Sequence, residues 1–148
     1  MQLAGGDDRM FPVFLFGTLK EGFPNAGTNN GSRVAGKFLT NNRYPLYLVG
    51  ERYSPWLVLS EGEGFQIRGQ VFMVDATTLS DMDRLERIHE ADGYRRVRMP
   101  VFSESTNEEI QVFVYVKPPE HLEGMLIQLG PIAEYELEHS SLYQKRNP

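Results

Sequence analysis

The chain has 148 residues, and its 15 Lys and Arg against 20 Asp and Glu give a formal net charge of −5 at pH 7. This length fits one globular domain, and 41% hydrophobic residues supply enough apolar surface for a core. The acidic balance argues against binding to phosphate backbones, which relies on clustered Lys and Arg. The absence of cysteine excludes disulfides, thiolate zinc sites and cysteine nucleophiles.

No stretch of the sequence reaches the ~18 to 20 apolar residues of a membrane-spanning helix, and the N-terminus lacks the pattern of a secretory signal. We therefore expect a cytoplasmic, monomeric protein whose partners include neither nucleic acid nor membrane. Residues 1–10 are small and polar, so we expect a flexible extension there, followed by a single domain at 11–148.

The domain is expected to begin with a strand at residues 13–16. This run is continuously apolar and ends at Gly17, which is typical of a strand buried on both faces and closed by a tight turn. The glycine- and asparagine-rich residues 18–31 indicate a loop. A second strand is expected at 33–40.

Two short apolar runs at 45–49 and 56–59, bounded by Gly, Pro and Ser, predict short strands. Residues 65–74 alternate first and become apolar later, which predicts a long strand that ends at Asp75. A helix should follow, because Leu79, Met82, Leu85 and Ile88 recur at helical spacing. Its expected cap is Thr77, Thr78 or Ser80, and its expected end is near Glu90.

Two further strands are expected at 94–102 and 109–117, and a short helix near 132–139. Five to seven strands with one main helix indicate an α+β fold. The specific prediction is a small mixed β-barrel with the main helix packed against it and a short C-terminal helix.

The turn after the first strand is the first candidate site. A buried strand that ends in a glycine turn exposes several backbone N–H groups in one direction, and such a nest binds anions. Gly17 also allows a ligand to approach the backbone closely. The same residues fit a plain turn after a strand, so the pattern alone leaves both interpretations open.

Glu86 is the second candidate, because helical periodicity places it between Leu79 and Met82 on the side that faces the core. Desolvation there would raise its pKa toward the range of a general acid or base at neutral pH. The alternative is a carboxylate at the rim of the helix that pairs with Arg87 or Arg95. His89 is also predicted to lie on the inner side.

Other chemistries lack a pattern in this sequence. The histidines are scattered, and no paired-carboxylate or His-x-x-x-His motif appears, so we expect no metal. No Gly-x-Ser-x-Gly motif indicates a serine nucleophile.

The two candidates belong together in a resemblance that covers nearly all of the chain from Phe11. The opening Phe16-Gly17-Thr18-Leu19-Lys20, with Gly22 and Asn25 behind it, is similar to the Tyr-Gly-Thr-Leu-Lys-x-Gly-x-x-Asn opening of the γ-glutamylcyclotransferase-like family. Later landmarks resemble the γ-glutamylamine cyclotransferase branch of that family. They are Tyr44-Pro45-Leu46, Gly50-Glu51, Pro55-Trp56-Leu57, Gly69-Gln70-Val71-Phe72-x-Val74-Asp75, Leu79-x-x-Met82-Asp83-x-Leu85-Glu86, Tyr94-x-Arg96, Phe113-Val114-Tyr115, Tyr143 and Asn147-Pro148.

The resemblance implies a β-barrel with flanking helices and an enzyme that needs no cofactor. Its activity would be conversion of a γ-glutamyl amine into 5-oxoproline and a free amine. Phe16, Gly17, Thr18 and Leu19 match the substrate-binding loop of the family, and Glu86 matches its catalytic acid/base. Phe16 departs from the usual Tyr, which puts a side-chain hydrogen bond in doubt.

Three functional hypotheses follow. The leading one is a cyclotransferase for γ-glutamyl amines such as γ-glutamyl-ε-lysine. The second is a cyclotransferase for γ-glutamyl dipeptides or for a γ-glutamyl-protected metabolite. The third is a non-catalytic domain that binds a metabolite or a protein. An unpaired carboxylate on the inner helix face argues against this third hypothesis.

Overall fold

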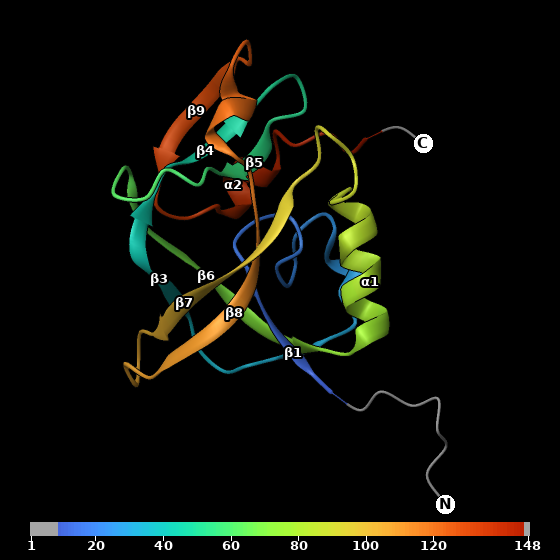
Figure 1. Cartoon of the computed structure of the whole chain (residues 1–148), viewed down its shortest axis with the longest axis vertical. Helices are drawn as coiled ribbons and strands as arrows, with labels where there is room; N and C mark the ends of the chain where they lie inside the picture. Colours follow the sequence, from blue (N-terminus) through green and yellow to red (C-terminus); the bar gives the residue numbers. More distant parts are fainter. Residues whose placement is uncertain (1–8, 147–148) are drawn as a thin grey trace, which may run out of the picture.

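A computed structural model of the chain describes residues 9–146 and shows a five-stranded barrel with one helix on its side and a small sheet at one end (Figure 1). Neighbouring barrel strands follow the order β1-β8-β7-β3-β6, and β6 pairs with β1 to close the barrel. The β1–β8 pair is parallel and its neighbours are antiparallel, so the barrel is mixed. The elements in chain order are β1 (Phe11–Leu15), η1 (Ala26–Thr28), β2 (Ser32–Arg33), β3 (Phe38–Tyr44), β4 (Leu46–Val49), β5 (Ser54–Leu57), β6 (Phe65–Val74), α1 (Ala76–Leu85), β7 (Arg95–Ser103), β8 (Glu109–Val116), η2 (Pro119–Leu122), β9 (Ile127–Ile132) and α2 (Leu137–Ser140).

The first strand is continuously apolar because its side chains enter two different cores. Phe14 is fully buried in the large core inside the barrel, together with residues such as Ile67 and Val101. Val13 and Leu15 point the other way, into a second core that includes Met82 of α1. Successive residues of a strand face opposite sides, so β1 is apolar at every position because it separates the barrel interior from the helix.

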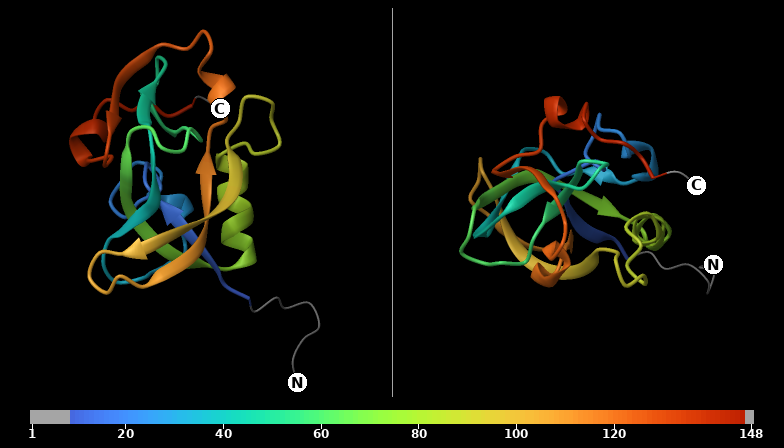
Figure 2. Two further views of the ribbon diagram at one scale, coloured as in Figure 1. Left: turned by 60° about the vertical axis from the view of Figure 1, so that its left-hand side comes forward. Right: turned by 90° about the horizontal axis from the view of Figure 1, so that it is seen from above.

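The small sheet has the strand order β5-β4-β9 and lies over one end of the barrel (Figure 2). An isolated bridge between Val58 and Lys117 joins the end of β5 to the end of β8. Two backbone hydrogen bonds of 2.9 Å, Leu59 N–H to Lys117 C=O and Lys117 N–H to Leu57 C=O, support that bridge. The end of β8 is therefore held directly beneath the β4–β5 hairpin.

The predicted α+β barrel with one main helix and a short C-terminal helix is confirmed, with corrections to several elements. The expected strand at 33–40 is wrong, because a turn at Gly36, whose φ is +94°, separates β2 from β3. The strand β9 is an addition to the predicted elements, and it contains the Gly130-Pro131 pair. Proline is tolerated on an edge strand, where its missing N–H costs no ladder bond.

The C-terminal helix begins later than the predicted residues 132–139, because β9 extends to Ile132 and the chain remains extended at Glu136. Glu136 and His139 then form a capping box that starts α2. The predicted extension at 1–10 lies largely outside the described residues, and the single domain at 11–148 stays a prediction.

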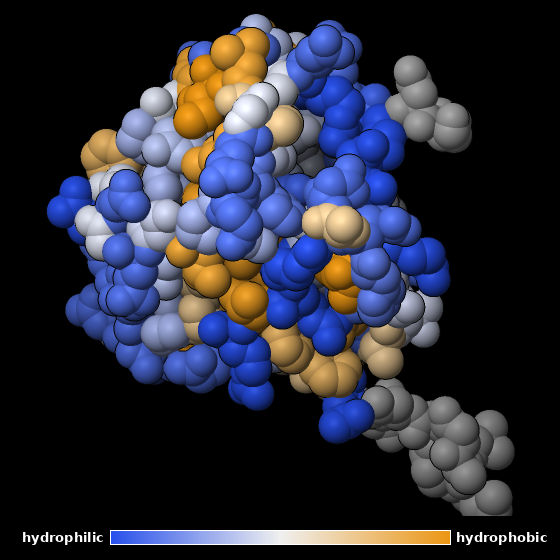
Figure 3. Space-filling model, turned by 45° about the horizontal axis from the view of Figure 1, so that its top comes forward, coloured by the Kyte–Doolittle hydropathy of each residue, from blue (hydrophilic) through white to orange (hydrophobic). Residues whose placement is uncertain are grey.

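No helix within the described part of the chain is long and apolar enough to cross a membrane. The face shown in Figure 3 is mainly hydrophilic, and its hydrophobic side chains gather in separate groups. Exposed apolar residues include a run at the start of β9, namely Met125, Leu126, Ile127 and Leu129.

Candidate active site

Residues 16–19, which we call the 16–19 loop, leave the buried end of β1 and remain buried themselves. Lys20 N–H donates to Gly17 C=O at 3.1 Å and Asn25 N–H donates to Thr18 C=O at 2.8 Å, so the loop is a closed turn. Within residues 9–146, the N–H groups of Gly17, Thr18 and Leu19 donate to no other group. Buried backbone donors are nearly always paired, so three adjacent free ones indicate a place for an anionic ligand.

The 16–19 loop packs tightly against Pro55 of β5. A Cβ atom added to Gly17 would lie 2.9 Å from Pro55 Cγ. The carbonyl of Pro55 accepts a hydrogen bond of 2.9 Å from the Tyr94 hydroxyl. Gly17 is therefore required by the close approach of Pro55, and Tyr94 fixes the strand that makes this approach.

The loop is also connected to the C-terminal segment. Asn25 Nδ2 donates to Thr18 Oγ1 at 2.9 Å and to the Tyr143 hydroxyl at 3.2 Å. A hydrogen bond of 3.0 Å from Gln144 N–H to Arg52 C=O joins the same segment to the β4–β5 turn. Residues far apart in the sequence are in this way held around one site.

Glu86 lies at the C-terminal end of α1, where it is the C-cap residue. The predicted helix end near Glu90 is wrong, because Arg87 adopts a positive φ of 55° and turns the chain out of the helix. The backbone of Glu86 is then held by a 3.0 Å hydrogen bond from Tyr94 N–H. The predicted cap is also wrong, because the Asp75 side chain accepts the Thr78 N–H at 2.8 Å and caps the helix.

The Glu86 carboxyl group has a pKa raised to about 7, because burial penalises its charged form. The positive charges of Lys117 and Arg52 oppose this effect. Neither predicted rim partner pairs with Glu86: Arg87 forms an ion pair of 2.9 Å with Asp92, and Arg95 donates to backbone carbonyls. The carboxyl is thus able to exchange a proton near neutral pH.

Two adjacent cavities meet at Glu86. A small cavity of about 30 Å³ is bordered by the whole 16–19 loop, and Glu86, Tyr94 and Tyr115 complete its lining. A large cavity of about 1170 Å³ opens beside it. Thr18, Pro55, Glu86 and Tyr94 line both cavities. The structure therefore brings together all five residues predicted for the site.

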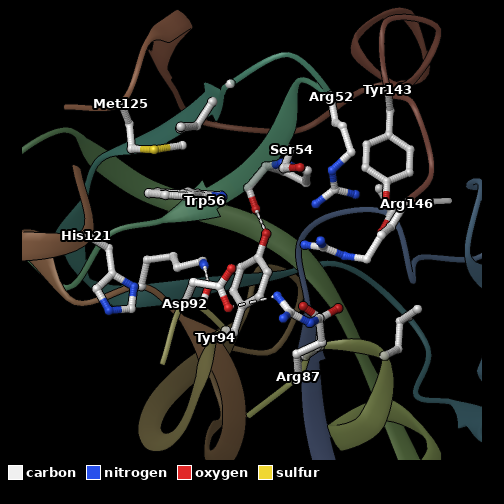
Figure 4. A pocket seen from close by; sticks show the side chains of 18 of the residues that line it. Arg52, Ser54, Trp56, Arg87, Asp92, Tyr94, His121, Met125, Tyr143 and Arg146 are labelled. Carbon is white, nitrogen blue, oxygen red and sulfur yellow. Dashed lines mark hydrogen bonds and ion pairs between the residues drawn. The ribbon is translucent and has the colours of Figure 1, made fainter. Parts of the chain in front are cut away.

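The large cavity adds residues that the sequence did not single out (Figure 4). Lys117 is buried, with its Nζ atom 4.4 Å from the centre of the Trp56 ring and 4.6 Å from that of Tyr94. Its ammonium donates to Asp92 C=O at 2.6 Å, and burial lowers its pKa to about 8. It supplies positive charge near Glu86 from the end of β8.

Histidine placement differs from the prediction. His89, expected on the inner side, is exposed because α1 ends before it. His121, which looked isolated in the sequence, borders the large cavity, and its Nδ1 atom has no hydrogen-bond partner within residues 9–146. In this same part of the chain, no group of three or more His, Asp or Glu side chains is placed to hold a metal ion.

Comparison with known proteins identifies the family of this chain. Residues 13–131 match the family described as gamma-glutamyl cyclotransferase, AIG2-like. The chain belongs to this family. Among its relatives, the gamma-glutamylaminecyclotransferase of Bos taurus is 35% identical over 127 residues, which are 78% of this chain and 74% of the bovine protein. A putative gamma-glutamylcyclotransferase of Drosophila melanogaster is 40% identical over 110 residues, 70% of this chain and 68% of the fly protein.

A solved structure supports the family assignment. The crystal structure of an AIG2-like protein from Mus musculus has a TM-score of 0.75 and 25% sequence identity to this chain. The match covers 95% of this chain and 97% of the mouse chain. This chain therefore shares the fold of the mouse protein over almost its whole length.

Proposed function

We propose that this chain is a γ-glutamylamine cyclotransferase, which converts a γ-glutamyl amine into 5-oxoproline and a free amine. The observation that carries the proposal is the small cavity. It is lined both by the 16–19 loop, three of whose N–H groups have no acceptor among the described residues, and by a carboxyl group with a pKa near 7. Membership in the cyclotransferase family and the names of the bovine and fly relatives support the same reaction.

The 16–19 loop binds the α-carboxylate of the glutamyl group in this proposal. Oriented N–H dipoles attract an anion without a charged side chain, and the buried position excludes competing water. Phe16 lacks the hydroxyl of the usual Tyr, but it is buried in the barrel core, so its role is to support the loop by packing. Holding the carboxylate curls the substrate so that its α-amine faces its own γ-carbonyl carbon. Such preorganisation of an intramolecular attack contributes a large part of a rate enhancement.

Glu86 moves the proton that this reaction needs. A peptide N-terminal amine has a pKa of about 7.7 to 8.0, and the neighbouring α-carboxylate raises the pKa of the substrate amine further. The amine therefore enters protonated and must give up a proton before it attacks. The ionised Glu86 accepts that proton, the nitrogen bonds to the γ-carbon, and the tetrahedral intermediate forms. Glu86 then returns the proton to the departing nitrogen as the C–N bond breaks. The ring nitrogen gives up its second proton through Glu86 to the released amine, which leaves as an ammonium ion. No water is consumed and no redox change occurs.

The first test is incubation of the purified protein with γ-glutamyl-ε-lysine and, separately, with γ-glutamyl dipeptides. Release of 5-oxoproline and lysine in equal amounts from the first substrate supports the proposal. Turnover of dipeptides alone would transfer the function to the second hypothesis. Stabilisation by 5-oxoproline without turnover of any substrate would support a binding domain instead.

We also propose that the enzyme acts as a monomer in the cytoplasm. The described residues of one chain supply the 16–19 loop, Glu86 and the walls of both cavities, so the reaction as proposed needs no second subunit. Sedimentation at the assay concentration tests the oligomeric state, and imaging of a tagged chain tests the location.

A further inference from the structure

Two arginine side chains that line the large cavity lack a partner among the residues that the structure describes. Arg52 comes from the β4–β5 turn and is half-buried, whereas Arg146 comes from the C-terminal segment and is exposed. Both guanidinium groups point into the cavity (Figure 4). Within residues 9–146, neither side chain forms a hydrogen bond or an ion pair. We call these two residues the arginine pair.

Other arginines on the same cavity are already neutralised by carboxylates. Arg87 forms an ion pair with Asp92, and Arg84 forms one with Asp81. The arginine pair therefore differs from its neighbours in having unsatisfied positive charge. Because guanidinium groups match carboxylates in geometry as well as charge, an anion is the ligand that this part of the cavity favours.

The backbone holds the arginine pair in place. Gly50 and Tyr53 both have positive φ, and Tyr53 N–H donates to Gly50 C=O at 3.2 Å, so the β4–β5 turn is tight. The hydrogen bond from Gln144 N–H to Arg52 C=O ties the C-terminal segment to this turn two residues before Arg146. Both guanidinium groups are thus presented from linked backbone.

The location decides which part of the substrate the arginine pair meets. Neither arginine borders the small cavity, where the 16–19 loop receives the glutamyl carboxylate. Arg52 is close enough to lower the pKa of Glu86, so the pair lies within electrostatic reach of the reacting carbonyl. A substrate held by the 16–19 loop with its γ-carbonyl at Glu86 has only the large cavity left for its leaving amine.

We propose that the arginine pair binds a carboxylate carried by the leaving amine, so that the preferred substrates are γ-glutamyl derivatives of amino acids, with lysine attached through its side-chain amine as the main example. This inference rests on the proposed function. Glu51, beside Arg52 in the turn, borders the same cavity without an ion pair, and it offers a counterpart for the ammonium group of such an amino acid. γ-Glutamyl derivatives of simple diamines lack this carboxylate and should therefore be poorer substrates for this enzyme.

A matched pair of substrates tests the proposal. γ-Glutamylcadaverine is γ-glutamyl-ε-lysine without the lysine carboxylate, and it keeps the same chain length and terminal ammonium. Hydrogen bonds to charged groups contribute enough to predict a kcat/KM that is ~10- to 100-fold higher for the lysine compound. Both reactions are followed by the release of 5-oxoproline.

Variants of the cavity arginines show which residues cause the preference for the lysine compound. Arg52→Gln should lower the ratio of kcat/KM for the lysine compound to kcat/KM for γ-glutamylcadaverine at least ~10-fold. Remaining turnover of γ-glutamylcadaverine shows that the variant is folded. Arg146→Gln should act in the same direction but less, because its guanidinium is more exposed. Arg84→Gln is the matched control, since it removes a cation that Asp81 already neutralises, and it should not change the preference.

The possible failures are distinguishable. Equal kcat/KM values for the two substrates, or an equal loss on both in Arg52→Gln, would overturn the carboxylate subsite while leaving the cyclotransferase intact. Absence of 5-oxoproline from both substrates would instead overturn the proposed function, and the subsite with it.

Discussion

The 16–19 loop and the arginine pair face the same substrate in different ways. The loop offers backbone N–H groups in a buried turn that Pro55 and Tyr94 fix in place. The arginine pair offers side chains from a hairpin turn and a C-terminal segment, where they are accessible to solvent. Backbone recognition depends little on side-chain identity, so this half of the site suits the glutamyl group that every substrate shares. Recognition by side chains changes with single substitutions, so substitutions of the arginine pair should change which substrates the enzyme accepts.

The largest effect is expected for Glu86, which lies where the two regions meet. Glu86→Gln keeps the shape of the side chain but removes its ability to accept a proton. Since general acid–base catalysis contributes ~10²- to 10⁴-fold, kcat should fall by about that factor for γ-glutamyl-ε-lysine and γ-glutamylcadaverine alike. Steady-state assays with both substrates measure it. A loss confined to one substrate would mean that Glu86 belongs to leaving-group recognition instead.

The same variant should reveal how much stability the protein loses by desolvating the Glu86 carboxylate. The pKa of Glu86 is raised from 4.5 to about 7 on folding, so the folded state holds a proton that the unfolded state has lost between these values. The contribution of Glu86 to the free energy of unfolding must therefore decrease as the pH rises from about 4.5 to about 7, by roughly 3 kcal/mol. The Glu86→Gln variant has no ionisable group at this position, so this pH-dependent loss of stability should be absent from it.

Thermal melts at pH 5 and pH 8 provide the measurement. The melting temperature of Glu86→Gln relative to wild type should be higher at pH 8 than at pH 5. Any effect of the new amide on stability that does not depend on pH cancels in this comparison between the two pH values. A difference that does not change with pH would contradict burial of the Glu86 carboxyl.

Gly17→Ala tests the backbone half of the site. The added methyl group must displace Pro55, which would lie 2.9 Å away, so the N–H groups of the 16–19 loop should lose their alignment. We expect kcat/KM to fall ~10- to 100-fold, equivalent to about 1.4 to 2.7 kcal/mol, and by the same factor for both substrates. Gly27→Ala is the control, because no atom lies within 4 Å of its added Cβ. A selective loss on one substrate would refute the assignment of the loop to the shared glutamyl group.

Tyr143→Phe should give the smallest effect, and it probes the connection between the two regions. It removes the acceptor of one Asn25 hydrogen bond while the bond from Asn25 to Thr18 remains. One hydrogen bond contributes about 1 kcal/mol, so KM should rise by roughly fivefold with kcat little changed. Kinetics on γ-glutamyl-ε-lysine are the readout. A fall in kcat as large as that expected for Glu86→Gln would assign Tyr143 to the proton transfer.

The sequence predicted the parts of the site that depend on local patterns. The 16–19 loop follows a short apolar strand, and Glu86 lies on a helix whose periodicity is visible in the sequence. Arg52 and Lys117 could not be found in this way, because the β4–β5 hairpin and the bridge between Val58 and Lys117 bring them to the cavity. The family resemblance linked the loop to Glu86 before the fold did, since no local pattern relates residues about 70 positions apart.

The fold was predicted less well where backbone geometry overrides residue preference. The helical spacing continues past Glu86 to Ile88, yet Arg87 takes a positive φ and ends α1 there. Gly93 accounts for this turn, because a Cβ at that position would lie 1.7 Å from the Arg87 carbonyl oxygen. The chain from Arg87 to Gly93 therefore folds back on itself, which aims Glu86 at the cavity and leaves His89 in solvent.

The central claim is that Glu86, with a pKa near 7, moves the proton during cyclisation at the 16–19 loop. The kcat/KM of the wild-type enzyme for γ-glutamyl-ε-lysine, measured from pH 5 to pH 9, tests it most directly. The account predicts an acidic limb with an apparent pKa of about 7 and a decline at higher pH, where the substrate amine loses its proton. It also predicts loss of the acidic limb in the residual activity of Glu86→Gln. An acidic limb near pH 4.5, or an unchanged profile in Glu86→Gln, would contradict it.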